Sequence, residues 1–180
     1  MHRREKLTVV VFAAVTLLAS TTNYVHAVAT FTTLHEFTGF DGANPQAGVT
    51  SVGSILYGTT NSGGADSYGT VYRFNLADNS FGTLHSFSNA SEGNLPAERV
   101  AAIGSALYGA AFSGGPSGAG TVYELGLSNN TLAILHSFST SEDDGAYPAT
   151  VLAQVGTKLY GTTQGITTQA GQSSVGKPMR

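Results

Sequence analysis

The sequence contains no cysteine and no tryptophan among its 180 residues, and charged residues make up only 11% of it. Without cysteine the chain has no disulfide framework, no zinc–thiolate site and no cysteine nucleophile. The formal net charge is −3, so no basic stripe is available for a phosphate backbone, and we expect no nucleic-acid partner. Glycine outnumbers proline 23 to 5, and glycine costs about 1 kcal/mol in a helix interior, which favours an all-β chain.

Residues 1–29 differ in composition from the rest of the chain. A basic start is followed by an apolar run over 7–19, which is shorter than the ~20 residues that span a bilayer. Small residues at Ala27 and Ala29 then offer a cleavage site for a signal peptidase. We predict a signal peptide over 1–29, no membrane span after cleavage, and a secreted or periplasmic location. An uncleaved anchor or a buried helix is the alternative.

Internal repeats dominate the remaining sequence. A Leu-His-x-Phe segment begins at Leu34, Leu84 and Leu135, and each copy is followed by an acidic-Gly-x-x-Pro segment. A Leu-Tyr-Gly segment begins at Leu56, Leu107 and Leu159, and a Gly-Thr-Val-Tyr segment begins at Gly69 and Gly120. The period is about 51 residues, which is typical of stacked repeat architectures. The predicted units are 30–80, 81–131 and 132–165, followed by a divergent tail over 166–180.

The spacing within the unit separates strands from loops. Each proline lies 12 residues before the Leu-Tyr-Gly tyrosine, whereas the distance from histidine to proline grows from 10 to 11 to 12. Constant spacing is typical of paired strands and tight turns, and variable spacing is typical of a surface loop. In the first unit we predict four strands, around 33–37, 47–52, 54–59 and 70–76. Four short strands repeated at this period indicate β-propeller blades, and a solenoid or an open sandwich is the alternative.

Taken together, the Leu-Tyr-Gly-Thr-Thr, Gly-Gly, Gly-Thr-Val-Tyr, Leu-His-Ser-Phe and Gly-x-x-Pro segments resemble the GloVer tandem repeat over residues 31–165. The resemblance implies an exported bacterial protein with a propeller-like array, and it implies no catalytic residue or ligand. A third Gly-Thr-Val-Tyr segment is due near residue 172, where the chain reads Gln-Ser-Ser-Val-Gly instead. We therefore expect about three four-stranded blades with the last incomplete, and open blade edges that favour self-association.

Two sets of equivalent side chains are candidates for chemistry. His35, His85 and His136 suit either a ring of metal ligands or general bases, or a structural role repeated in every unit, which we favour. The loop acids Asp41, Glu92 and Asp144 are candidate binding residues. Calcium binding there would need about six oxygens, more than one carboxylate per loop supplies.

No catalytic constellation is present, so the sequence favours an exported non-enzymatic scaffold that binds a glycan or a protein. An exported propeller enzyme using acids of adjacent loops on glycans is the first alternative. A remnant of a longer repeat array is the second. No catalytic, cofactor-binding or metal-binding residue is assigned.

Overall fold

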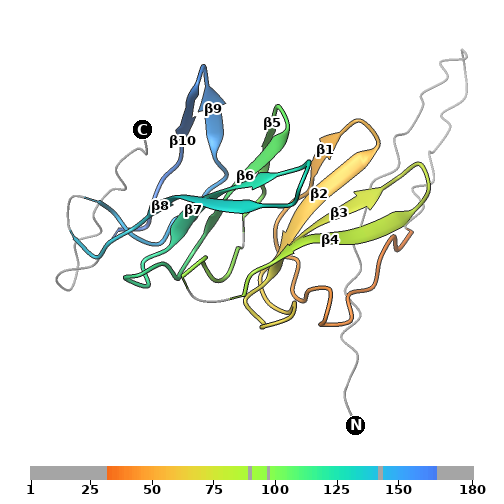
Figure 1. The fold of residues 1–180 in the computed structure, drawn as a ribbon, viewed down its shortest axis with the longest axis horizontal. Coiled ribbons are helices and arrows are strands. Elements are labelled where there is room, and N and C mark those ends of the chain that lie inside the picture. The colour runs from red at the N-terminus through yellow and green to blue at the C-terminus, as the bar shows by residue number, and fades with distance from the viewer. Residues whose placement is uncertain (1–31, 89–90, 97, 142–143, 166–180) are drawn as a thin grey trace, which may run out of the picture.

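The structure of the chain, a computed structural model, describes residues 32–88, 91–96, 98–141 and 144–165. The described residues form β-strands, turns and loops, and no helix (Figure 1). None of these residues belongs to a helix able to cross a membrane. The predicted signal peptide, with Ala27 and Ala29, and the tail over 166–180 lie outside the described residues.

Two antiparallel sheets of four strands follow one another along the chain, each in the order of the sequence. The first sheet consists of β1 (Thr50–Val52), β2 (Ile55–Thr60), β3 (Thr70–Asn75) and β4 (Ser80–Ser86). The second consists of β5 (Ala101–Ile103), β6 (Ala106–Ala111), β7 (Thr121–Gly126) and β8 (Leu132–Ser137). A third sheet has two strands in the described part, β9 (Ala153–Val155) and β10 (Lys158–Tyr160).

The predicted strands over 47–52, 54–59 and 70–76 are confirmed as β1, β2 and β3, with shorter bounds at some ends. Gly53, Gly104 and Gly156 make the tight turns between the first two strands of each sheet, with φ of +58°, +59° and +61°. A side chain is disfavoured at such angles, whereas glycine adopts them readily. The same turn therefore recurs in all three sheets.

The prediction of a strand over 33–37 is wrong beyond an isolated bridge at Thr33. Its equivalents β4 and β8 are strands because each pairs with the Gly-Thr-Val-Tyr strand that precedes it. Among the described residues, no such strand precedes Leu34, so the backbone of this segment has no partner. Each four-stranded sheet thus joins three strands of one repeat to the Leu-His-x-Phe strand that opens the next.

A glycine and a tyrosine interlock in the middle of each four-stranded sheet. Gly58 of β2 lies opposite Tyr72 of β3, and Gly109 of β6 lies opposite Tyr123 of β7. A Cβ atom placed on either glycine would overlap the ring and the hydroxyl of its tyrosine. The tyrosine rings therefore cover the backbone of the neighbouring strand, which explains why Leu-Tyr-Gly and Gly-Thr-Val-Tyr recur together.

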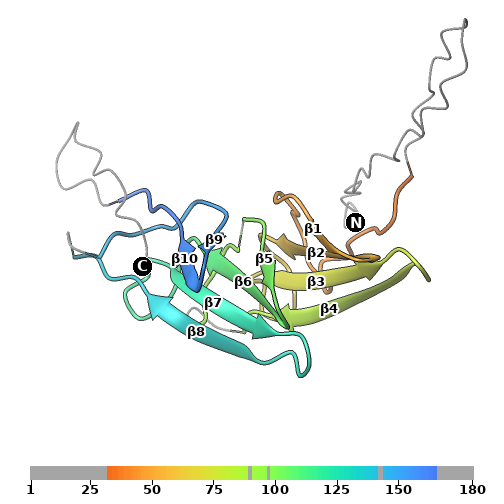
Figure 2. The same cartoon turned by 90° about the horizontal axis from the view of Figure 1, so that it is seen from above.

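The hydrophobic core lies between successive sheets, not within one. One cluster of buried residues joins the first sheet to the second: Tyr57, Val71, Phe87, Val100, Leu107, Tyr123 and Leu125. A second cluster joins the second sheet to the third: Ala119, Val122, Phe138, Ala146 and Leu152. β1 contacts β5, and the Thr50 hydroxyl donates a hydrogen bond to the Val100 carbonyl. The sheets accordingly stand side by side when seen from above (Figure 2).

Candidate functional site

A histidine–carboxylate pair closes the variable loop in all three repeats. The Nε2 atom of each histidine donates to a carboxylate: His35 to Asp41 at 2.8 Å, His85 to Glu92 at 3.2 Å and His136 to Asp144 at 2.8 Å. The paired residues are 6, 7 and 8 positions apart along the chain. One hydrogen bond therefore closes loops of three different lengths.

Each carboxylate also accepts a hydrogen bond from the backbone just after the Leu-His-x-Phe segment. The donors are the amides of Thr38 at 2.7 Å, Ser88 at 3.0 Å and Ser139 at 2.7 Å. Partial burial opposes the negative charge, but the amide and histidine bonds outweigh it. They hold the pKa of Asp41, Glu92 and Asp144 below the ordinary carboxyl value. The three acids are therefore ionised at neutral pH and already bonded inside their own loops.

The histidine rings are packed as well as hydrogen-bonded. Each lies edge-on against the phenylalanine two residues later, with ring centroids 4.7 to 5.1 Å apart. His35 also stacks on Phe81 of β4 at 3.6 Å. The described residues hold no group of three or more histidine or acidic side chains that could bind a metal ion. His85 of β4 and His136 of β8 lie in different sheets, and His35 lies outside the described strands. Their contacts favour the structural role.

Buried threonines of the sheets donate hydrogen bonds to the backbone of the acidic loops. The Thr70 hydroxyl of β3 donates to the Asp41 carbonyl at 3.3 Å, and the Thr121 hydroxyl of β7 donates to the Glu92 carbonyl at 2.9 Å. Both threonines are fully buried. The threonine of Gly-Thr-Val-Tyr therefore joins the centre of its sheet to the acidic loop. The role of Asp41, Glu92 and Asp144 as binding residues stays a prediction. Each would have to bind a ligand while keeping its hydrogen bonds inside the loop.

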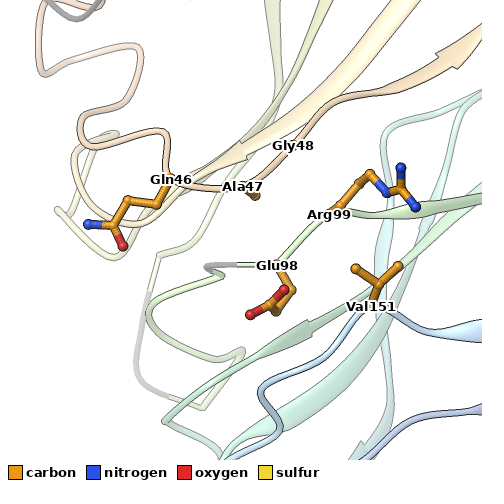
Figure 3. A pocket seen from close by; sticks show the side chains of 6 residues that line it. All are labelled: Gln46, Ala47, Gly48, Glu98, Arg99 and Val151. Carbon is orange, nitrogen blue, oxygen red and sulfur yellow. The ribbon is translucent and has the colours of Figure 1, made fainter.

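Equivalent positions of all three repeats converge on one open hollow of about 510 Å³ (Figure 3). Gly48, Arg99 and Val151 each lie three residues after a loop proline, and Ala47 and Glu98 each lie two residues after one. Gln46 completes the lining. The hollow lies where the chain passes from each loop into the first strand of the following sheet, so residues of all three repeats line it.

Glu98 and Arg99 bring two opposite charges to this hollow. No ion pair or side-chain hydrogen bond joins Glu98 or Arg99 to another residue of the described part. Burial raises the pKa of Glu98 above the ordinary glutamate value. The Glu98 backbone is held in place, because its carbonyl accepts a hydrogen bond from the Thr59 hydroxyl at 3.1 Å. Glu98 and Arg99 thus present charged groups to solvent. Gln46 adds an exposed amide, whose Oε1 accepts a hydrogen bond from Asn61 Nδ2 at 3.4 Å.

Sequence reasoning missed both arrangements. It treated the histidines and the acids as separate sets, although the acid always lies four residues before the proline. All the length variation therefore falls between histidine and acid, and that constant spacing was the available signal. The hollow had no comparable signal, because Gln46, Glu98 and Arg99 come from two repeats and only two of them share a short stretch of chain.

These features define a class: an all-β tandem-repeat protein whose sheets pack on one another through equivalent residues. The chain belongs to the Gloeobacter/Verrucomicrobia repeat family, whose model matches residues 20–176. This match confirms the resemblance noted from the motifs. No curated protein matches the chain.

Proposed function

We propose that the chain is an exported, non-enzymatic binding scaffold that holds a polar ligand in the hollow around Gln46, Glu98 and Arg99. The observation that carries the proposal is the convergence of equivalent residues from three repeats on one hollow, with charged groups that no described neighbour engages. Packed repeats often present their binding residues in this way, at a position where successive units meet.

The arrangement of the sheets supports a propeller-like array. Successive sheets pack through shared hydrophobic clusters, β1 lies beside β5, and the hollow forms where the chain enters the first strand of each sheet. In a propeller the first strands of the blades surround a central channel. The hollow would then be one mouth of that channel.

The chemistry of the hollow limits the ligand. The Arg99 guanidinium presents planar N–H donors that suit a carboxylate or sulfate. Glu98 accepts hydrogen bonds from hydroxyl groups, and the Gln46 amide adds N–H donors. A hydroxyl-rich anionic ligand, such as an acidic glycan, fits this set. An extended peptide ending in a carboxylate is the alternative within the same site. Export by the predicted signal peptide would place the scaffold among such ligands.

The test is binding of the full chain to an array of acidic and neutral glycans and of short peptides with free carboxyl termini. Arg99→Gln and Glu98→Gln should each abolish binding, because both remove a charge. Glu98→Gln also keeps the side-chain shape, whereas Arg99→Gln leaves a shorter polar side chain. Asp41→Asn is the matched control, since it removes a charge from a loop and should leave binding intact. Binding lost in the control but kept in the hollow variants would contradict the proposed site. A chain that binds nothing on the array would contradict the scaffold role.

A further inference from the structure

The third sheet leaves one edge of β10 without a neighbouring strand in the described part of the chain. β10 is the equivalent of β2 and β6, because its tyrosine Tyr160 lies 12 residues after the loop proline, as Tyr57 and Tyr108 do. β2 pairs with β1 on one edge and with β3 on the other, and β6 pairs likewise with β5 and β7. Among the described residues, β10 pairs with β9 alone. Its second edge presents backbone donors and acceptors that no described strand engages.

A buried hydroxyl beside this edge lacks the bond that its equivalent makes. Thr60, three residues after Tyr57, lies 2.8 Å from the Thr70 hydroxyl and accepts a hydrogen bond from the Thr70 amide at 3.0 Å. Thr163 holds the same position after Tyr160 and is 6% exposed. Its hydroxyl oxygen has no hydrogen-bond partner in the part of the chain that the structure describes. An unsatisfied buried hydroxyl is costly, so Thr163 marks the place of a missing threonine.

An aromatic position in the second core cluster points to the same missing strand. In the first two repeats, the phenylalanine of the Leu-His-x-Phe segment contacts the tyrosine of the next Gly-Thr-Val-Tyr strand: Phe37 with Tyr72 at 5.2 Å and Phe87 with Tyr123 at 5.3 Å. Phe138 is the equivalent phenylalanine and is buried. The described residues that follow it include no tyrosine equivalent to Tyr72 or Tyr123.

We propose that the free edge of β10 accepts an extended Gly-Thr-Val-Tyr segment supplied by another repeat polypeptide, as a strand added to the third sheet. In the register that β3 adopts on β2, the incoming threonine would lie opposite Thr163 and the incoming tyrosine opposite Gly161. That tyrosine would then reach Phe138. Backbone hydrogen bonds supply affinity in such strand addition, and the threonine and tyrosine supply specificity.

A folded second copy of the chain is a poor donor. Its two Gly-Thr-Val-Tyr strands, β3 and β7, are each paired on both edges within their own sheets. Donating either would require opening a sheet and a core cluster. The donor is therefore a polypeptide in which this segment is not already paired. This surface is separate from the hollow, so the proposal stands or falls independently of the proposed function.

The test uses the full chain and a labelled synthetic peptide with the sequence of residues 119–126, Ala-Gly-Thr-Val-Tyr-Glu-Leu-Gly. Fluorescence anisotropy should show saturable binding, weakened at least tenfold by replacing the peptide's tyrosine with alanine. Hydrogen exchange should show protection of residues 158–163 in the complex. The absence of saturable binding, or equal affinities for the two peptides, would overturn the proposal.

Thr163→Val is the decisive variant of the chain, because it removes the hydroxyl and keeps the shape. We expect it to raise the melting temperature of the free chain, since it removes an unsatisfied buried group, and to weaken peptide binding about fivefold, the effect of one neutral hydrogen bond. A lower melting temperature would mean that the hydroxyl is already bonded and the edge already filled. A discrete dimer by light scattering that excludes the peptide would assign the edge to a second copy. Either result would refute the proposal.

Discussion

Replacing Gly109 by alanine tests the interlock between the Leu-Tyr-Gly and Gly-Thr-Val-Tyr strands. An added Cβ atom would lie 2.9 Å from Cε2 of Tyr123 and closer still to the end of the ring. Carbon atoms in contact prefer 3.5 to 4.0 Å, so the ring or the strand must move. Tyr123 is fully buried among Phe87 and its neighbours, which leaves the ring little room to yield.

The interlock predicts that Gly109→Ala lowers the free energy of unfolding, whereas an ordinary strand glycine predicts the opposite. Alanine in an ordinary strand interior is about 0.5–1 kcal/mol more stable than glycine. Overpacking a tight core costs about 1–3 kcal/mol, so Gly109→Ala should lower the free energy of unfolding by about that amount. Gly82→Ala in β4 is the matched control, because its nearest contact would be an ordinary 3.5 Å to Arg73 Nε. That variant should be neutral or stabilising.

Urea denaturation followed by circular dichroism and tyrosine fluorescence measures both variants. In a Tyr123→Ala background the ring is gone, so the Gly109→Ala change should no longer be destabilising. This loss of effect is the coupling that a double-mutant cycle detects between contacting residues. If Gly109→Ala stabilised the chain as much as Gly82→Ala does, the interlock would not determine the strand sequence.

Three further predictions concern single groups. Tyr123→Phe should raise the free energy of unfolding by about 1 kcal/mol in the same urea assay, because the buried hydroxyl has no hydrogen-bond partner among the described residues. Burial alone raises the pKa of this hydroxyl. A destabilised variant would contradict this prediction. The low folded-state pKa of Asp41 means that its contribution to stability is complete above the unfolded carboxyl pKa of about 4 and is lost as the pH falls through the folded value. Thermal melts between pH 7 and pH 2 should therefore show a smaller acid loss for Asp41→Asn, and equal losses would argue against the loop closure. Asn130 has φ of +53° in the turn between β7 and β8, so Asn130→Ala should cost about 1 kcal/mol and Asn130→Gly much less; equal effects on melting temperature would refute the conformational explanation.

The strands of the repeat were predictable from the sequence because pairing keeps spacing constant. The constant 12-residue spacing from proline to the Leu-Tyr-Gly tyrosine marked β2 and β6, and the recurring Gly-Thr-Val-Tyr segment marked β3 and β7. Which strands share a sheet was not predictable in the same way. The Leu-His-x-Phe strand opens each repeat in sequence but hydrogen-bonds to the preceding unit, and period alone does not distinguish these two assignments.

The site was harder to predict than the fold for a physical reason. The pairing of His136 with Asp144 depends on a loop folding back on itself, and the hollow depends on repeats meeting in space. The only sequence signal of the pairing was the constant four-residue spacing from acid to proline, and the hollow left no comparable signal. The unsatisfied hydroxyl of Thr163 could not be predicted from the sequence either. Only the structure shows that the Thr60 hydroxyl is hydrogen-bonded to Thr70, whereas the Thr163 hydroxyl has no partner among the described residues.

Under the proposed function, the hollow around Glu98 and Arg99 binds the ligand and the closed loops do not. Hydrogen exchange of the full chain, with and without a glycan or peptide selected on the array, tests this most directly. We expect protection at 46–48, at Glu98 and Arg99, and at 149–151, with the exchange of the loop segments 38–42 and 144–146 unchanged. Protection confined to those loop segments, with the hollow unaffected, would contradict it.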